Sequence, residues 1–260
     1  MKIRAFLLLS VVTACAACGA STPPPPPLEP TAEEPRERKT GGLPSVSQEL
    51  GSIDPKKVEQ TFKNLQVGAI ETCHKQGRDR IEFLTGDVKV FLRIDGSGKV
   101  KYGFFEQTSI GDRETEKCIL GALANASWPK PEGGEAEVRS GFGWGSGGER
   151  EPTSWSSDKV TAALADAKDV KSDVGKCKSG VTGDFVVTAY VEHDDSAPAK
   201  PAPAKRGKKG DKDKGGKFKA IGVAPPSKEG AEKIDCIVDA LKPLDLPSPG
   251  SYAAKVTFTL

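Results

Sequence analysis

Cysteine and histidine are the residues here best suited to redox, metal or nucleophilic chemistry, and they are few. The 260 residues include six cysteines and two histidines. His74 follows Cys73, but no larger group of soft ligands surrounds either histidine, which argues against a zinc-type site. No Ser/His/Asp set recurs, and the carboxylates are scattered. The sequence therefore predicts no catalytic residues, no metal and no cofactor, and we expect a protein that is not an enzyme.

The N-terminus has the pattern of an export signal. A basic start precedes an apolar run that is too short to span a bilayer. Val12–Cys15 resembles the lipobox of bacterial lipoproteins, which predicts a signal peptide over residues 1–14 and lipid attachment at Cys15. Ala16, where an Asp would imply retention in the inner membrane, favours the outer membrane, facing the periplasm. The alternatives are Cys18 as the acyl acceptor or an ordinary signal cut without lipid.

The segment that follows has too few apolar residues to form a core. It is rich in Pro, Glu, Arg and Lys and contains the proline run Pro23–Pro27. Such a composition favours extended, disordered chain. Residues 15–52 are therefore predicted to be an acylated, Pro-rich tether.

An internal duplication is the most informative feature of the chain. Cys118–Leu123 matches Cys236–Leu241, and Gly86–Ile94 matches Gly183–Val191. An upstream cysteine, downstream prolines and a valine recur in the same order at matching places. The predicted organisation is a first domain at 53–144, a Gly-rich linker at 145–156 and a second, divergent copy at 157–260.

Each copy shows the same succession of hydrophobic periods. In the first, Asp54-Pro55 is a helix start, and apolar residues recur at helical spacing as far as Cys73. Gly86–Ile94 then alternates, with Val, Leu and Ile on one face, as in a half-buried strand. A glycine turn, a strand, a helix containing Cys118 and a last strand follow. The expected fold is α+β: helix-strand-strand-helix-strand with an antiparallel sheet in each copy.

Four cysteines follow the leader, two in each copy at matching positions. In an exported protein, an even number of cysteines is typical of disulfides. Three connectivities are possible, and the duplication selects Cys73–Cys118 and Cys177–Cys236. A catalytic thiol is the rival interpretation, although the folded part contains no C-x-x-C motif.

The second copy differs from the first at its hairpin. Where the first has a short glycine turn, the second has a basic insert at about residues 195–217, which we expect to be disordered. An arm for anionic envelope polymer is one hypothesis, and a tolerated surface insertion is the other. The basic residues that would contact such a polymer are Lys205, Arg206, Lys208 and Lys209.

One set of residues in the first copy carries a family resemblance: Cys73, Gly86, Gly98, Val100, Gly111-Asp112, Cys118-Ile119, Trp128-Pro129 and Gly133-Gly134. In these residues the first copy resembles the AgmX/PglI C-terminal domain, which is itself similar to the C-terminal domain of TonB-type proteins. The second copy keeps fewer of the matching residues. The resemblance implies an envelope or motility-associated protein without catalytic residues, and TonB-like relatives bind partner peptides by strand addition.

These features predict a non-catalytic lipoprotein of the cell envelope whose tandem modules bind a protein or peptide partner in the periplasm. Without the two basic residues of the leader, 36 of the 38 Lys and Arg remain against 36 Asp and Glu, so the mature chain has no net charge. A chain without net positive charge has no general attraction to nucleic acid, which argues against a nucleic-acid partner. An electrostatic tether through the basic insert is the alternative, and an envelope enzyme is a weaker one. Four aromatic residues mark either a binding face or the core: Phe104, Phe105, Trp128 and Trp144.

Overall fold

A computed structural model describes residues 50–194 and 215–260, and there the two copies, called the first and second repeat below, belong to one compact unit. Helices pack on antiparallel sheets, which confirms the α+β class. Cys15, the tether up to residue 49 and the four basic residues of the insert lie outside the described residues.

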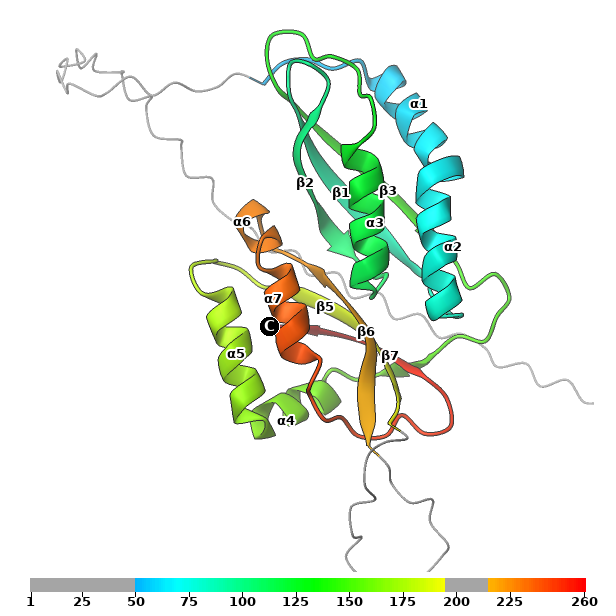
Figure 1. Ribbon diagram of the computed structural model, residues 1–260, viewed down its shortest axis with the longest axis vertical. Helices are drawn as coiled ribbons and strands as arrows, with labels where there is room; N and C mark the ends of the chain where they lie inside the picture. Colours follow the sequence, from blue (N-terminus) through cyan, green and yellow to red (C-terminus); the bar gives the residue numbers. More distant parts are fainter. Residues whose placement is uncertain (1–49, 195–214) are drawn as a thin grey trace, which may run out of the picture. The chain divides into compact units, whose positions relative to one another are not determined.

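The first repeat is a three-stranded antiparallel sheet with its helices on one face (Figure 1). The strand order is β2-β1-β3, so β1 is central. A π-helical turn joins α1 and α2 into one continuous helical stretch. The elements are α1 (Pro55–Leu65), the π-turn η1 (Gln66–Ile70), α2 (Glu71–Arg80), β1 (Gly86–Ile94), β2 (Val100–Thr108), α3 (Arg113–Ala124) and β3 (Ala136–Trp144).

Local chemistry explains where these elements begin. The Asp54 side chain accepts hydrogen bonds from the backbone N–H groups of Lys56 (3.0 Å) and Lys57 (3.3 Å), and Pro55 takes the first helical position. In the β1–β2 hairpin, Asp95 accepts N–H bonds from Ser97 (2.8 Å) and Lys99 (3.0 Å). These short-range bonds fix α1 and the hairpin close to where the sequence places them.

The core of the first repeat lies between the sheet and the helices. Val88, Val90, Leu92 and Ile94 on β1 are buried, as their alternation predicts. They pack in one cluster with residues of the helices, among them Phe62 of α1. One sheet face is therefore covered by helices, and the other carries charged side chains together with Phe91, which packs against Tyr102 and Phe104.

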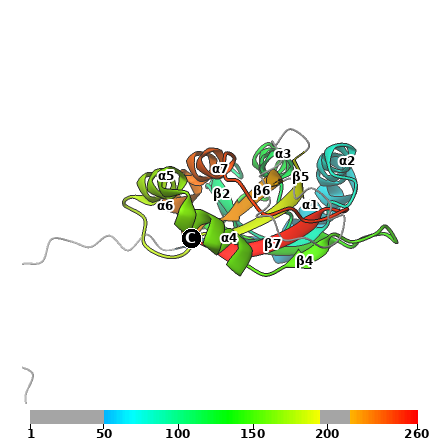
Figure 2. The same cartoon turned by 90° about the horizontal axis from the view of Figure 1, so that it is seen from below.

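The second repeat has a sheet of four strands in the order β4-β7-β5-β6, with α5 and α7 on one face (Figure 2). Strands β5, β6 and β7 pair antiparallel, and β4 pairs parallel to β7. The elements are β4 (Thr153–Trp155), α4 (Asp158–Asp166), α5 (Lys168–Lys178), β5 (Val186–His193), β6 (Gly216–Ala224), α6 (Lys228–Ala231), α7 (Ile234–Leu241) and β7 (Ala254–Thr259).

Some boundaries differ from those expected from the sequence. Strand β4 lies inside the segment 145–156 that was expected to be linker, and β6 begins at Gly216, inside the range expected for the insert. Ser52, at the end of the expected tether, forms an isolated bridge with Glu132. β4 and Ser52 each pair with a segment that is distant in the sequence, so local composition does not reveal their structure.

One disulfide links the helices of each repeat, as predicted. Cys73 of α2 is bonded to Cys118 of α3, and Cys177 of α5 is bonded to Cys236 of α7, each with the Cα atoms 5.6 Å apart. Each bond ties the first helical stretch of a repeat to the helix before its last strand.

Candidate functional site

The outer edge of β3 has no strand partner within residues 50–194 and 215–260. β3 pairs with β1 along its whole length and ends the sheet. Just before β3, Gly51 donates its backbone N–H to the carbonyl oxygen of Glu135 at 2.8 Å. Alternate residues of an edge strand direct N–H and C=O groups away from the sheet. The nine residues of β3 therefore present a row of backbone donors and acceptors.

A groove of about 490 Å³ lies between this edge and α1. Phe62 is 4% exposed and packs edge-on against Trp128, with the ring centroids 4.8 Å apart, so this part of the wall belongs to the packed core. Charged side chains of both signs, such as Glu59 and Lys63, also line the groove. Its lining includes Ile53, Val58, Phe62, Gln66, Val138 and Ser140. The groove can therefore take an apolar side chain from a segment that pairs with β3.

The π-turn η1 continues α1 beyond the groove. It begins at Gln66, which lines the groove, and the next residue, Val67, is 83% exposed. π-turns inside α-helices are frequent at functional sites. Val67 thus offers an exposed apolar contact immediately after the groove in the chain.

The second repeat covers the corresponding edge with its own chain. Ala254, at the start of β7, lies as far beyond Cys236 as Ala136, at the start of β3, lies beyond Cys118. On β7, Ala254–Val256 pair with β4, and Trp155 of β4 is buried among the core residues of the repeat. The two repeats therefore differ at one edge, which β4 covers over Ala254–Val256 in the second repeat and which has no strand partner in the described part of the first.

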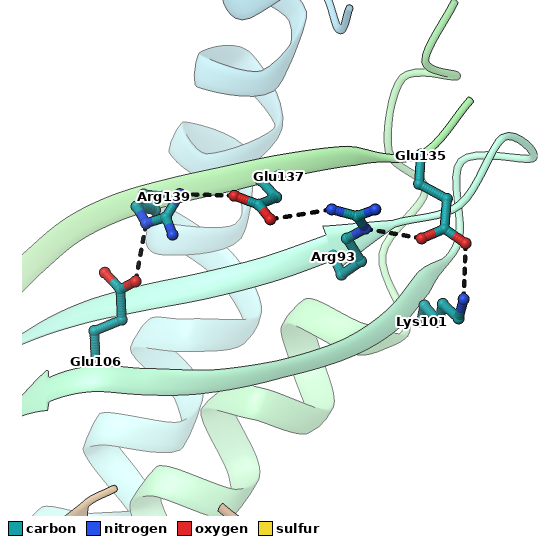
Figure 3. Close-up of polar contacts among 6 residues, drawn as sticks. All are labelled: Arg93, Lys101, Glu106, Glu135, Glu137 and Arg139. Carbon is teal, nitrogen blue, oxygen red and sulfur yellow. Dashed lines mark hydrogen bonds and ion pairs between the residues drawn. The ribbon is translucent and has the colours of Figure 1, made fainter. Parts of the chain in front are cut away.

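The uncovered face of the first sheet is a self-paired polar surface rather than a charged site. Figure 3 shows ion pairs that run across its three strands. Arg93 contacts Glu135 (2.8 Å) and Glu137 (3.0 Å), and the hydrogen bond to Glu135 raises the pKa of Arg93. Arg139 continues the series, and its guanidinium lies 4.6 Å from the ring centre of Phe91. The six residues of the series are Lys101, Glu135, Arg93, Glu137, Arg139 and Glu106, three of each sign.

Two titratable side chains lie where the repeats meet, and of these Glu116 is buried and Lys255 is half-buried. Glu116 accepts a bond from the Thr108 hydroxyl at 2.9 Å, and burial raises its pKa to about 8. Lys255 donates to the carbonyl of Thr85 at 2.8 Å, and burial lowers its pKa to about 8. Neither side chain lines the β3 groove, so we assign both to the contact between the repeats.

The aromatic residues named from the sequence do not form one binding face. Phe105 and Trp128 are buried, and the Trp128 indole N–H donates to the Leu123 carbonyl at 2.9 Å. Phe104 and Trp144 are half-buried. Trp144 stacks on His74 with the ring centroids 4.3 Å apart, and burial lowers the pKa of this histidine. Packing therefore explains Phe105 and Trp128, and Trp144 joins the end of β3 to α2.

Sequence reasoning missed the β3 edge and its groove. A signal was present in the match between Ser52-Ile53 and Ser154-Trp155, because each pair stands at the same distance before the first valine of its helical stretch. That match relates the two entry segments but does not show which edge is covered. Only the strand pairing shows the difference.

Comparisons with protein-family models, with curated proteins and with solved structures returned no match to this chain. In residues 50–194 and 215–260, no helix has the length and apolar content needed to cross a bilayer. The same residues contain no group of three or more His, Cys, Asp or Glu side chains arranged to hold a metal ion.

Proposed function

We propose that the protein is a non-catalytic binding module, in which the first repeat takes an extended segment of a partner protein along β3. The carrying observation is a nine-residue edge strand beside a groove of about 490 Å³. Strand addition obtains affinity from main-chain hydrogen bonds and specificity from pockets for alternate side chains. The edge and the groove supply these two elements side by side.

The second repeat supports the direction of pairing. Its β4 runs parallel to β7, and Thr153 donates its backbone N–H to the Ala253 carbonyl at 2.9 Å. Gly51 makes the corresponding bond to Glu135 in the first repeat. A partner segment that continues this line would run parallel to β3 and place every second side chain towards α1.

The proposal is tested with paired substitutions at Arg139. By the pattern of the parallel ladder, the Arg139 N–H points away from β1, so Arg139→Pro removes an outward donor while the pairing with β1 remains. Arg139→Ala keeps the N–H and removes only the charged side chain. Ten-residue peptides are selected on the full chain from a random display library, and their affinities are measured by calorimetry. We expect the affinity for the peptides to fall about tenfold in Arg139→Pro and less than about threefold in Arg139→Ala.

Circular dichroism of both variants controls for folding, and Gly141→Pro replaces Arg139→Pro if the latter does not fold. In the wild-type chain, amide shifts caused by the peptides should be confined to β3 and α1. Equal affinities for the proline and alanine variants would contradict strand addition. Strand addition would also be contradicted if none of the selected peptides changed the amide shifts of β3 and α1.

We further propose that this module is a lipoprotein on the periplasmic side of the outer membrane, in an envelope or motility-associated assembly. The lipobox-like Val12–Cys15 and the resemblance of the first repeat to the AgmX/PglI C-terminal domain support this. Cys15→Ser should move the protein from the membrane fraction to the soluble fraction of cells, while Cys18→Ser should leave it membrane-bound. Membrane pelleting of the Cys15→Ser protein would exclude attachment at Cys15.

A further inference from the structure

The entry segments of the two repeats begin with the same bond and then diverge. Gly51 donates to Glu135, and Thr153 donates to Ala253, at 2.8 and 2.9 Å. These acceptors stand at matching distances from Cys118 and Cys236. Beyond this bond, only the second repeat continues as a strand on the sheet edge.

The residue that differs is the one that faces the groove. Ile53 lies five positions before Val58, and Trp155 lies five positions before Val160. Ile53 lines the groove of the first repeat. Trp155 is only 7% exposed and belongs to the core cluster of the second repeat, with the Lys159 ammonium 4.3 Å from its ring centre. Trp155 thus stands, in the second repeat, at the position of the groove-lining Ile53 and is buried there.

We propose that β4 is a built-in strand ligand that closes a second binding site, the β7 edge, from within the chain. The occupant that can replace it is an extended partner segment that runs parallel to β7 and carries an aromatic residue in the place of Trp155. The proposal rests on the proposed function, because it assigns the same mode of binding to the second repeat. The chain then offers one open site and one closed site rather than two equal ones.

The fold of the second repeat does not depend on β4 for its sheet. Strands β5, β6 and β7 form their own antiparallel ladders, and a disulfide holds α5 to α7. The first repeat has its fold with three strands, and within the described residues the segment that corresponds to β4 adds no fourth strand to its sheet. The chain before β4 also contains Gly147 and Gly148, which have positive φ and open space where a side chain would lie. β4 can therefore leave the edge while the remaining sheet persists.

The test uses a peptide with the sequence of residues 149–158 and the full chain carrying Arg139→Pro, so that the edge of the first repeat is blocked. In this background, Trp155→Ala should bind the peptide at least tenfold more tightly than the protein that retains Trp155, because β4 no longer competes. Peptide binding should raise the melting temperature of the Trp155→Ala protein and slow hydrogen exchange at Ala254–Val256. The same peptide with Trp replaced by Ala should do neither.

A folded Trp155→Ala protein that does not bind the peptide, or that gains no protection at Ala254–Val256, would overturn the built-in ligand. Either result would leave the proposal for the first repeat intact, since that edge is blocked in this experiment. If Trp155→Ala does not fold, Trp155→Leu takes its place. Hydrogen exchange of the wild-type chain then gives a second criterion: the Thr153 amide should exchange at least 100-fold faster than amides of β5. Equal rates would show that β4 opens only with the whole sheet and would also overturn the proposal.

Discussion

Glu116 occupies surroundings that suit an uncharged carboxyl group. It is fully buried, the Thr108 hydroxyl donates to it, and the Val223 backbone N–H lies at 3.4 Å. Burial is the largest cause that raises its pKa to about 8, while the charge of Arg113 acts in the opposite direction. At neutral pH, this carboxyl group is therefore mostly protonated in the folded chain.

Stability should consequently fall as the pH rises through a defined window. The folded chain holds the Glu116 proton more tightly than the unfolded chain, so the free energy of unfolding decreases between about pH 4.5 and about pH 8 and then levels off. One such group contributes a slope of at most about 1.4 kcal/mol per pH unit. Glu116→Gln removes the titration and should flatten this slope, as measured by urea unfolding at several pH values.

The difference between wild type and variant is the quantity that tests Glu116. His74 titrates in part of the same window with the opposite sign, since its lowered pKa makes the folded chain more stable as the pH rises. Its contribution is the same in both proteins and cancels in the difference. If the two slopes are equal, the Glu116 carboxyl group is already ionised in the folded chain.

The disulfides act on whole elements, because each one joins two helices that lie on the same face of a sheet. Their sequence separations are 45 and 59 residues. In the chain-entropy model, loops of these lengths each contribute about 4 kcal/mol, with a difference of only a few tenths. Removal of either disulfide should therefore lower the free energy of unfolding, measured by urea denaturation, by a similar amount. The two double variants are Cys73→Ser/Cys118→Ser and Cys177→Ser/Cys236→Ser. A cost below about 1 kcal/mol for either pair would contradict this account.

The elements that the sequence predicted well are those fixed by local signals. Asp54 caps α1, and the alternation of β1 places its aliphatic residues in the core. β4 was missed because three residues show no periodicity and their partner, β7, lies about a hundred positions later. The β3 groove was missed for a related reason, since an edge is defined by the absence of a neighbouring strand. Contacts between distant segments therefore decide the candidate site, and a single sequence does not display them.

On the scale of the whole molecule, side chains of the second repeat complete the core of the first. Tyr190 of β5 belongs to the core cluster of the first repeat, with its ring centroid 5.4 Å from that of Phe83. Its hydroxyl accepts the Thr85 N–H (3.2 Å) and donates to the Thr85 carbonyl (3.1 Å). Arg113 adds an ion pair to Asp235 at 2.8 Å. These contacts should make the two repeats unfold as one cooperative unit.

Removing the Tyr190 hydroxyl tests this coupling. Tyr190→Phe keeps the ring in place but leaves the Thr85 N–H without its acceptor, which should cost about 1–3 kcal/mol. The lost hydrogen bonds connect one repeat to the other and do not hold either core together. We therefore expect the single calorimetric transition of the wild type to separate into two. Tyr102→Phe is the matched control, because it also removes a tyrosine hydroxyl. It keeps the Tyr102 ring, which lies 4.6 Å from the Lys228 ammonium of the second repeat, so this contact between the repeats remains. A single, unshifted transition in Tyr190→Phe would mean that the repeats are coupled by apolar packing alone, because only the hydroxyl has been removed.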